Sequence, residues 1–125
     1  KIRRYLMIYT KFNAVDSLKP KKSWTWEGTD YSGFIYKGED TAPTESEIDA
    51  EVTRLNNAEP MRLLRVKRDK LLADCDWRAS SDLTLSDDWK TYRQSLRDLP
   101  ASASPKLDTN GHLDLTSVTF PTKPS

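Results

Sequence analysis

The 125-residue sequence has one cysteine, one histidine and only four glycines. One cysteine cannot form a disulfide within the chain, and one cysteine with one histidine provides too few ligands for a structural zinc site. The chain also lacks the patterns of phosphate-binding loops, zinc proteases, calcium loops and serine hydrolases. No apolar run approaches the roughly 20 residues of a membrane-spanning helix. These absences argue against an enzyme and against a bound metal or cofactor.

The few side chains that could take part in catalysis or metal binding are each explained by an ordinary structural role. His112 follows Gly111 in a polar stretch, where a solvated histidine is the ordinary finding. Cys75 lies between two aspartates that disfavour a thiolate, so we expect a small core residue there. The aspartate pairs 74/76 and 87/88 are expected at helix ends rather than in acid–base catalysis. We therefore expect no catalytic residue, no metal ligand and no cofactor.

Charge is arranged in blocks, although the net charge is only +1. Residues 1–22 hold seven basic side chains against one acid, whereas residues 27–59 hold nine acids against two basic residues. Such blocks either form an ordinary solvated surface or pair between copies in an assembly. The basic start followed by apolar residues is similar to a signal peptide, but Lys11 interrupts it and no cleavage site follows, so we reject that interpretation.

The first 43 residues predict a small β-rich segment. Residues 3–9, 23–26 and 34–36 are aromatic and aliphatic and predict strands, while residues 13–18 predict one helical turn. Gly28 and Gly33 mark the turn between the second and third strands. Basic residues lie beside these aromatics at Lys19, Lys21 and Lys22. This composition is also typical of a surface that binds single-stranded nucleic acid. Because the alternate aromatics suit a buried sheet face and acids flank them, we favour the core interpretation.

Residues 44–100 predict a helical hairpin. Thr44 and Glu47 form a capping box, so a helix begins near residue 45, with a break expected at residues 56–60 or a new helix starting at Pro60. Helical spacing then continues to Asp74. Ser86 caps a further helix that we expect to end at Pro100. Its apolar residues recur at intervals of 4, 3, 4 and 3 and lie at Leu85, Trp89, Tyr92, Leu96 and Leu99.

Residues 101–125 are rich in Ser, Pro, Asp and Gly and predict an extended C-terminal arm, with a weak strand over residues 113–120. Such a segment cannot fold alone, so it docks on the same chain or on a neighbour. The fold class expected overall is α+β, with segments 1–43, 44–100 and 101–125.

Two strings in the hairpin resemble a domain of tailed bacteriophages, the tail assembly chaperone-like or tail fibre-associated domain. The first is R-x-x-L-L-A-x-x-D-W, from Arg68 to Trp77, and the second is Y-R-x-x-L-R-D-L-P, from Tyr92 to Pro100. The family often closes with Trp-Pro-x-x-Pro, where this chain has Phe120-Pro121-Thr122-Lys123-Pro124. Phenylalanine keeps the aromatic anchor but lacks the indole N–H donor. The resemblance covers residues 61–124. Within the hairpin, we expect Trp77 to pack over Tyr92 and Leu96. We also expect the arginines of the two strings to fix the hairpin by pairing with Asp76 and Asp98; they are Arg68, Arg93 and Arg97.

The resemblance implies a non-enzymatic phage protein that works by protein–protein contact. The leading hypothesis is a structural protein of the tail or tail fibres in the virion. A transient assembly chaperone, a head decoration protein and a nucleic-acid-binding module are the alternatives. Expected partners are other phage structural proteins or neighbouring copies in a multi-subunit assembly, with no membrane. The expected locations are the virion, and the host cytoplasm during assembly. The candidate partner-binding residues are Trp77, Tyr92, Arg93, Arg97, Phe120 and Pro121.

Overall fold

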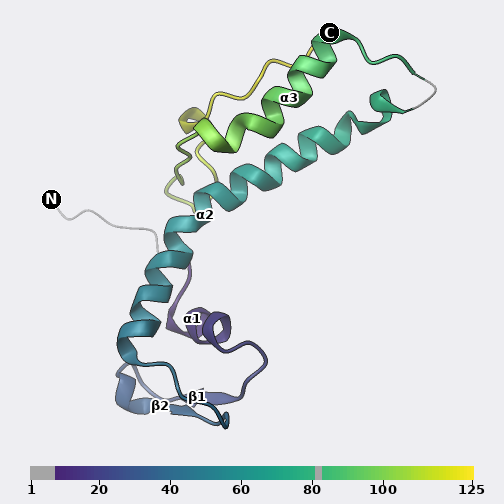
Figure 1. Cartoon of the computed structure of the whole chain (residues 1–125). Helices are drawn as coiled ribbons and strands as arrows, with labels where there is room; N and C mark the ends of the chain where they lie inside the picture. The colour runs from purple at the N-terminus through teal and green to yellow at the C-terminus, as the bar shows by residue number, and fades with distance from the viewer. Residues whose placement is uncertain (1–7, 81–82) are drawn as a thin grey trace, which may run out of the picture. The chain divides into compact units, whose positions relative to one another are not determined.

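The computed structural model describes residues 8–80 and 83–125 (Figure 1). Within these ranges the chain forms three α-helices, a two-stranded antiparallel sheet and three short 3-10 helices, which confirms the α+β class. The chain divides into two compact units, Lys1–Ala58 and Glu59–Ser125, called here the N-terminal and C-terminal units. The boundary lies inside helix α2. The division into segments 1–43, 44–100 and 101–125 stays a prediction.

The sheet of the N-terminal unit is held together by its aromatic face. Strands β1 (Trp24–Trp26) and β2 (Phe34–Tyr36) pair with Trp24 opposite Tyr36 and Trp26 opposite Phe34, which confirms both predicted strands. The 3-10 helix η1 (Tyr31–Gly33) lies between them. A Cβ at Gly33 would lie 1.8 Å from the carbonyl oxygen of Glu27, so this turn requires glycine. The aromatics join the core, as the alternation predicted.

Helix α1 (Lys11–Leu18) covers that aromatic face. Its buried residues Ala14 and Val15 form a cluster with Ile48 of α2. The Phe12 ring lies nearly parallel to the Trp24 ring, with centroids 6.0 Å apart. Ile8 and Tyr9 lie just before α1, and their backbone N–H groups donate hydrogen bonds to the Asn56 side chain of α2. The strand predicted over residues 3–9 lies mostly outside the described residues.

Helix α2 (Glu45–Asp74) begins and ends where the sequence predicted. Thr44 Oγ1 accepts from the Glu47 N–H at 3.1 Å, and Glu47 Oε1 accepts from the Thr44 N–H at 2.8 Å, which confirms the capping box. The break expected at residues 56–60 was wrong, because α2 runs through Pro60. Proline removes one backbone donor, while burial of Ile48 on one side and Leu64 on the other stabilises the helix around it.

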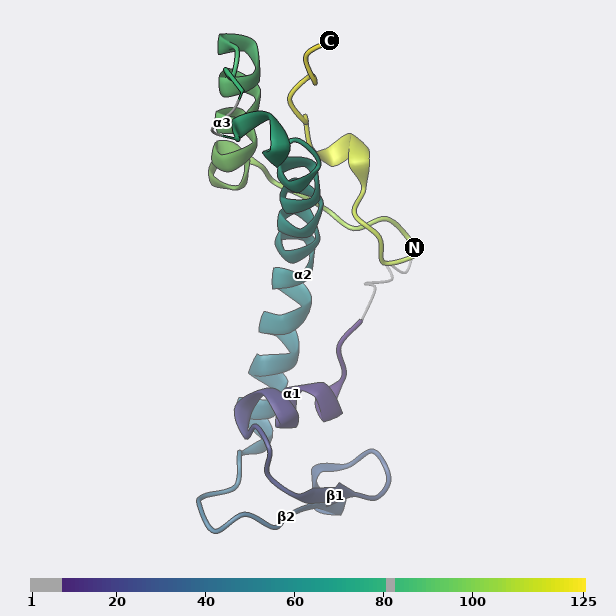
Figure 2. The same ribbon diagram turned by 90° about the vertical axis from the view of Figure 1, so that its right-hand side faces the viewer.

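Helix α3 (Asp87–Ser102) lies antiparallel beside the second half of α2 (Figures 1 and 2). The Ser86 side chain accepts from the Trp89 N–H, as predicted. The expected end at Pro100 was wrong, because the last turn continues to Ser102 and the Ala103 N–H donates to the Leu99 carbonyl. The predicted apolar face is buried: Cys75, Trp89, Tyr92 and Leu96 form one cluster, with Leu71, Leu72 and Leu85 packed against it. Cys75 is thus a core residue.

The C-terminal segment, residues 103–125, docks on its own chain. Val118 is buried with Leu64 and Leu99, and Met61 and Phe120 pack against this cluster. The strand predicted over residues 113–120 was wrong: an isolated bridge joins Leu107 and Leu113, and the 3-10 helix η3 (Leu115–Ser117) follows. Asp114 accounts for the turn, because its carboxylate accepts from the Thr116 N–H and hydroxyl. Among the described residues, no helix has the length and apolarity needed to span a membrane.

Glu51 makes the stability of the N-terminal unit depend on pH. Its buried carboxylate accepts hydrogen bonds from Arg54 at 2.6 and 2.7 Å and from the Ser17 hydroxyl at 2.5 Å. These bonds, those from Arg54 foremost, lower the pKa of Glu51 from 4.5 to about 2. A lowered pKa in the folded state stabilises the fold above the unfolded pKa, and this stabilisation is lost as pH falls toward the folded pKa.

We therefore expect Glu51→Gln to reduce stability at pH 7 and to flatten the loss of stability between about pH 4.5 and pH 2. Urea unfolding at a series of pH values measures both effects. Glu45→Gln, at an exposed position on the same helix, is the control. An unchanged acid profile in Glu51→Gln contradicts the assignment.

Candidate partner-binding surface

The six candidate partner-binding residues all lie in the C-terminal unit, but the structure gives them different environments. Tyr92 and Arg93 are buried, whereas Trp77 and Arg97 are exposed and Phe120 and Pro121 are half-buried. Two of the six, Tyr92 and Arg93, therefore lie in the interior and not on the surface. Each is placed by a different contact of the helical hairpin.

Tyr92 belongs to the interior of the hairpin. Its ring meets the Trp89 ring edge to face, with centroids 5.5 Å apart, and both lie in the cluster around Leu96. Burial raises the pKa of the Tyr92 hydroxyl, with a further contribution from neighbouring Cys75 and Asp74. The side chain serves the α2–α3 contact and offers little surface to a partner.

Arg93 ties α3 to the end of α2. Its Nη1 donates to the Leu72 carbonyl at 3.1 Å and to Cys75 Sγ at 3.0 Å, while Nη2 donates to Asp76 Oδ1 at 2.8 Å. The expected pairing of Arg93 with Asp76 is confirmed. The hydrogen bond to Asp76 raises the pKa of the Arg93 guanidinium, and burial opposes it. Arg93 is thus a buried side chain whose hydrogen bonds connect α3 to the end of α2.

Trp77 lies outside the core. We expected it to pack over Tyr92 and Leu96, but 58% of its surface is exposed. The reason is its position: α2 ends at Asp74, and Trp77 lies in the following 3-10 helix η2 (Asp76–Ala79), off the face that meets α3. Its ring contacts Arg78 instead, whose guanidinium carbon lies 4.5 Å from the Trp77 centroid and 4.0 Å from the Trp89 centroid.

Arg97 and the C-terminal aromatic lie along α3. Arg97 donates to Gln94 at 3.3 Å rather than to Asp98, and Arg68 pairs with Asp69, so these two arginines do not fasten the hairpin as expected. The Lys67 ammonium lies over the Phe120 ring, 5.7 Å from the centroid of that ring. Phe120 and Pro121 also border a shallow groove whose remaining lining residues are Ser95, Asp98, Leu99, Ser102, Thr119 and Thr122.

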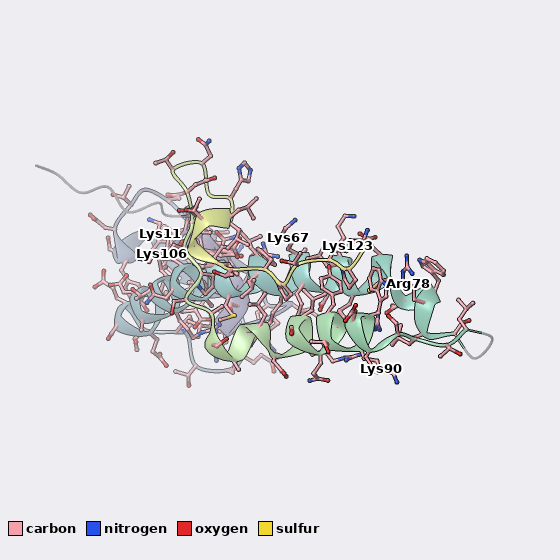
Figure 3. All side chains as sticks on the ribbon, turned by 90° about the horizontal axis from the view of Figure 1, so that it is seen from above. Lys11, Lys67, Arg78, Lys90, Lys106 and Lys123 are labelled. Atoms are coloured by element: carbon pink, nitrogen blue, oxygen red, sulfur yellow. The ribbon has the colours of Figure 1, made fainter. Side chains whose placement is uncertain are left out.

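Arg78 and Leu83 are features that sequence reasoning missed. Figure 3 shows Arg78 toward the end of the hairpin where α2 gives way to α3, with Lys90 near the same end. Leu83 is 49% exposed just before α3. The sequence signal for Arg78 was its position beside Trp77, since arginine stacks readily on indole rings. In the described part of the chain, no group of three or more potential metal-binding side chains comes together.

One comparison with known proteins gave a match. Residues 61–125, just over half of the chain, match a family model described as phage tail assembly chaperone protein. No curated protein and no solved structure matches the chain. The matched residues nearly coincide with the C-terminal unit, which begins at Glu59.

Proposed function

This chain belongs to the phage tail assembly chaperone family, and from this membership we propose that it binds tail or tail-fibre proteins in the host cytoplasm while the tail is assembled. A chaperone needs a folded unit that presents a contact surface to its client. The C-terminal unit meets this need, because its own cluster of Leu64, Leu99 and Val118 packs the C-terminal segment against the hairpin at Val118. The family match to this unit is the observation that carries the proposal.

We propose that the protein acts by contact and not by catalysis. Among the described residues, three charged side chains are buried, and each is bonded within the fold. Glu51 is bonded to Arg54 and Ser17. Glu59 is bonded to Arg62, and Arg93 is bonded to Leu72, Cys75 and Asp76. Catalytic groups usually converge on a cleft with part of their hydrogen-bonding capacity left for substrate. The bonds of Glu51 and Arg93 are instead directed at structural partners.

The competing proposal is a permanent component of the tail or fibres in the virion, the leading hypothesis from the sequence. A component of the finished particle is expected to have its C-terminal segment ordered against neighbouring proteins. Here Val118 is buried against the hairpin of its own chain, so the segment needs no neighbour for its packing. The chaperone role therefore has the better support.

The decisive experiment follows the protein through phage assembly. A tagged chain expressed with the phage's tail proteins is expected to co-purify with one of them, and mass spectrometry of purified virions is expected to find none of the chain. Phage that carry an early stop codon in the gene for this chain should form fewer complete tails. Recovery of the chain from virions at a constant copy number would instead support the structural role.

A further inference from the structure

The outer edge of strand β1 carries backbone groups that point away from the sheet. The Lys37 N–H donates to the Ser23 carbonyl, so Ser23 faces β2. The groups that face a partner strand alternate along an antiparallel ladder, so Thr25 also faces β2. The N–H and C=O groups of Trp24 and Trp26 therefore face outward. Within the described ranges, no hydrogen bond joins these outward groups to another segment.

The residues of β1 do little to block a further strand. Proteins often protect a sheet edge with a proline, a charged residue or a bulge, and Trp24–Trp26 holds none of these. A two-stranded sheet is also marginal in water by itself. The β2 edge differs, because the Phe34 N–H already donates to the Tyr31 carbonyl. The β1 edge is thus the better place for strand addition.

The two ends of β1 carry opposite charge. Lys21 and Lys22 precede the strand and Glu27 follows it, and all three side chains are exposed. Other charged residues adjoin these ends through α1, the turn between the strands and the end of β2. With them, the first end has Lys21, Lys22 and Lys37 against Asp16 and Glu39, and the second has Glu27 and Asp30 against Lys11. The first end is therefore net positive and the second net negative.

A second copy of β1 complements this edge in both hydrogen bonding and charge. Antiparallel pairing about a two-fold axis places Trp24 opposite Trp26 of the second copy, and the two Thr25 residues opposite each other. The outward N–H and C=O groups of the tryptophans then bond reciprocally, and this register keeps the indole rings on one face. The positive end of each strand lies beside the negative end of the other, which favours this orientation.

We propose that two copies of this chain associate through their β1 strands and form a four-stranded sheet in the order β2-β1-β1-β2. The inference concerns the N-terminal unit, which the family match does not cover, so it stands apart from the chaperone function. A strand of three residues buries little area, so the association is expected to be weak and to depend on protein concentration.

Amide hydrogen exchange, measured by NMR on the full-length chain at rising concentration, locates the contact. The amide protons of Trp24 and Trp26 are expected to exchange more slowly as concentration rises, because they gain acceptors in the second copy. The Tyr36 amide faces outward on the β2 edge and is the internal control. Slower exchange at Tyr36 in place of the tryptophans would overturn the inference. Protection of the tryptophan amides at every concentration would also overturn it, by assigning the edge to the same chain.

Charge reversal tests the orientation of the two strands. Lys22→Glu and Glu27→Lys each bring like charges together at both ends of the pair, so each should weaken association about tenfold at low salt. An equimolar mixture of the two variants restores opposite charges at both ends and should associate like the wild type. Lys90→Glu and Asp49→Lys reverse exposed charges elsewhere and should have no effect. Sedimentation equilibrium measures association, and circular dichroism should show every variant folded.

Wild-type association in the two β1 variants, or a mixture that associates as weakly as each variant alone, would contradict the proposed pairing. A chain that stays monomeric at every concentration would do the same, whether or not a tail protein co-purifies with it. If a co-purified tail protein protects the Trp24 and Trp26 amides of a monomeric chain, the edge belongs to the client and not to a second copy.

Discussion

Replacing Leu96 with alanine is expected to lower the free energy of unfolding of the C-terminal unit by about 3 kcal/mol. Leu96 is fully buried between α2 and α3, in the cluster with Trp89, Tyr92 and Cys75. Truncation removes apolar contacts and leaves a cavity that the surrounding rings cannot readily fill. Urea unfolding followed by far-ultraviolet circular dichroism measures the change.

The control is Leu115→Ala, which makes the same chemical change at a side chain that is 57% exposed. Its effect should stay within about 0.5 kcal/mol, as for ordinary surface substitutions. Equal effects for the two variants would contradict the placement of Leu96 in the core. Because small domains have little stability to spare, Leu96→Ala should also increase proteolysis of the C-terminal unit.

Replacing Arg93 with methionine is expected to cost about 2 kcal/mol, through a different mechanism. Methionine fills part of the volume but donates no hydrogen bond, so the Leu72 carbonyl and Cys75 Sγ lose their bonds from the guanidinium. The ion pair with Asp76 should add little, because 63% of the Asp76 side chain is exposed and water screens the attraction. Thermal and urea unfolding both report the loss.

Two companion variants test this division. Asp76→Asn keeps an acceptor for Arg93 and should cost under about 1 kcal/mol, since the lost attraction is exposed. Arg93→Lys keeps the charge but loses the fixed geometry of the guanidinium, so its cost should lie between those of the other two. A larger loss in Asp76→Asn than in Arg93→Met would show that the ion pair, and not the buried bonds, fastens the hairpin.

Stability and binding should respond to different residues of the same hairpin. Leu96 and Arg93 lie inside it, so their replacement should lower the free energy of unfolding of the C-terminal unit. Trp77 lies outside the core, and its replacement should leave unfolding almost unchanged while client binding falls. This separation is a direct consequence of the end of α2 at Asp74, three residues before Trp77.

Local patterns were sufficient for most element positions and for the family. The capping box at Thr44 and the cap at Ser86 each depend on residues three apart, so the start of α2 and of α3 could be predicted. The helix break predicted near Pro60 and the helix end predicted at Pro100 were both wrong. Pro60 and Pro100 each remove one donor, and tertiary packing of Leu64 and Leu99 sustains the helices through them.

By itself, the sequence determined the α+β class, the paired aromatic strands, the buried face of α3 and the resemblance that the family match confirmed. Only the tertiary structure decided that Arg93 is buried, that Trp77 is exposed, and that the C-terminal segment docks on its own hairpin. The physical reason is that periodicity and caps describe one element at a time. Burial depends on what packs across from that element, and here the opposing groups are Leu72 for Arg93 and Leu64 for Val118.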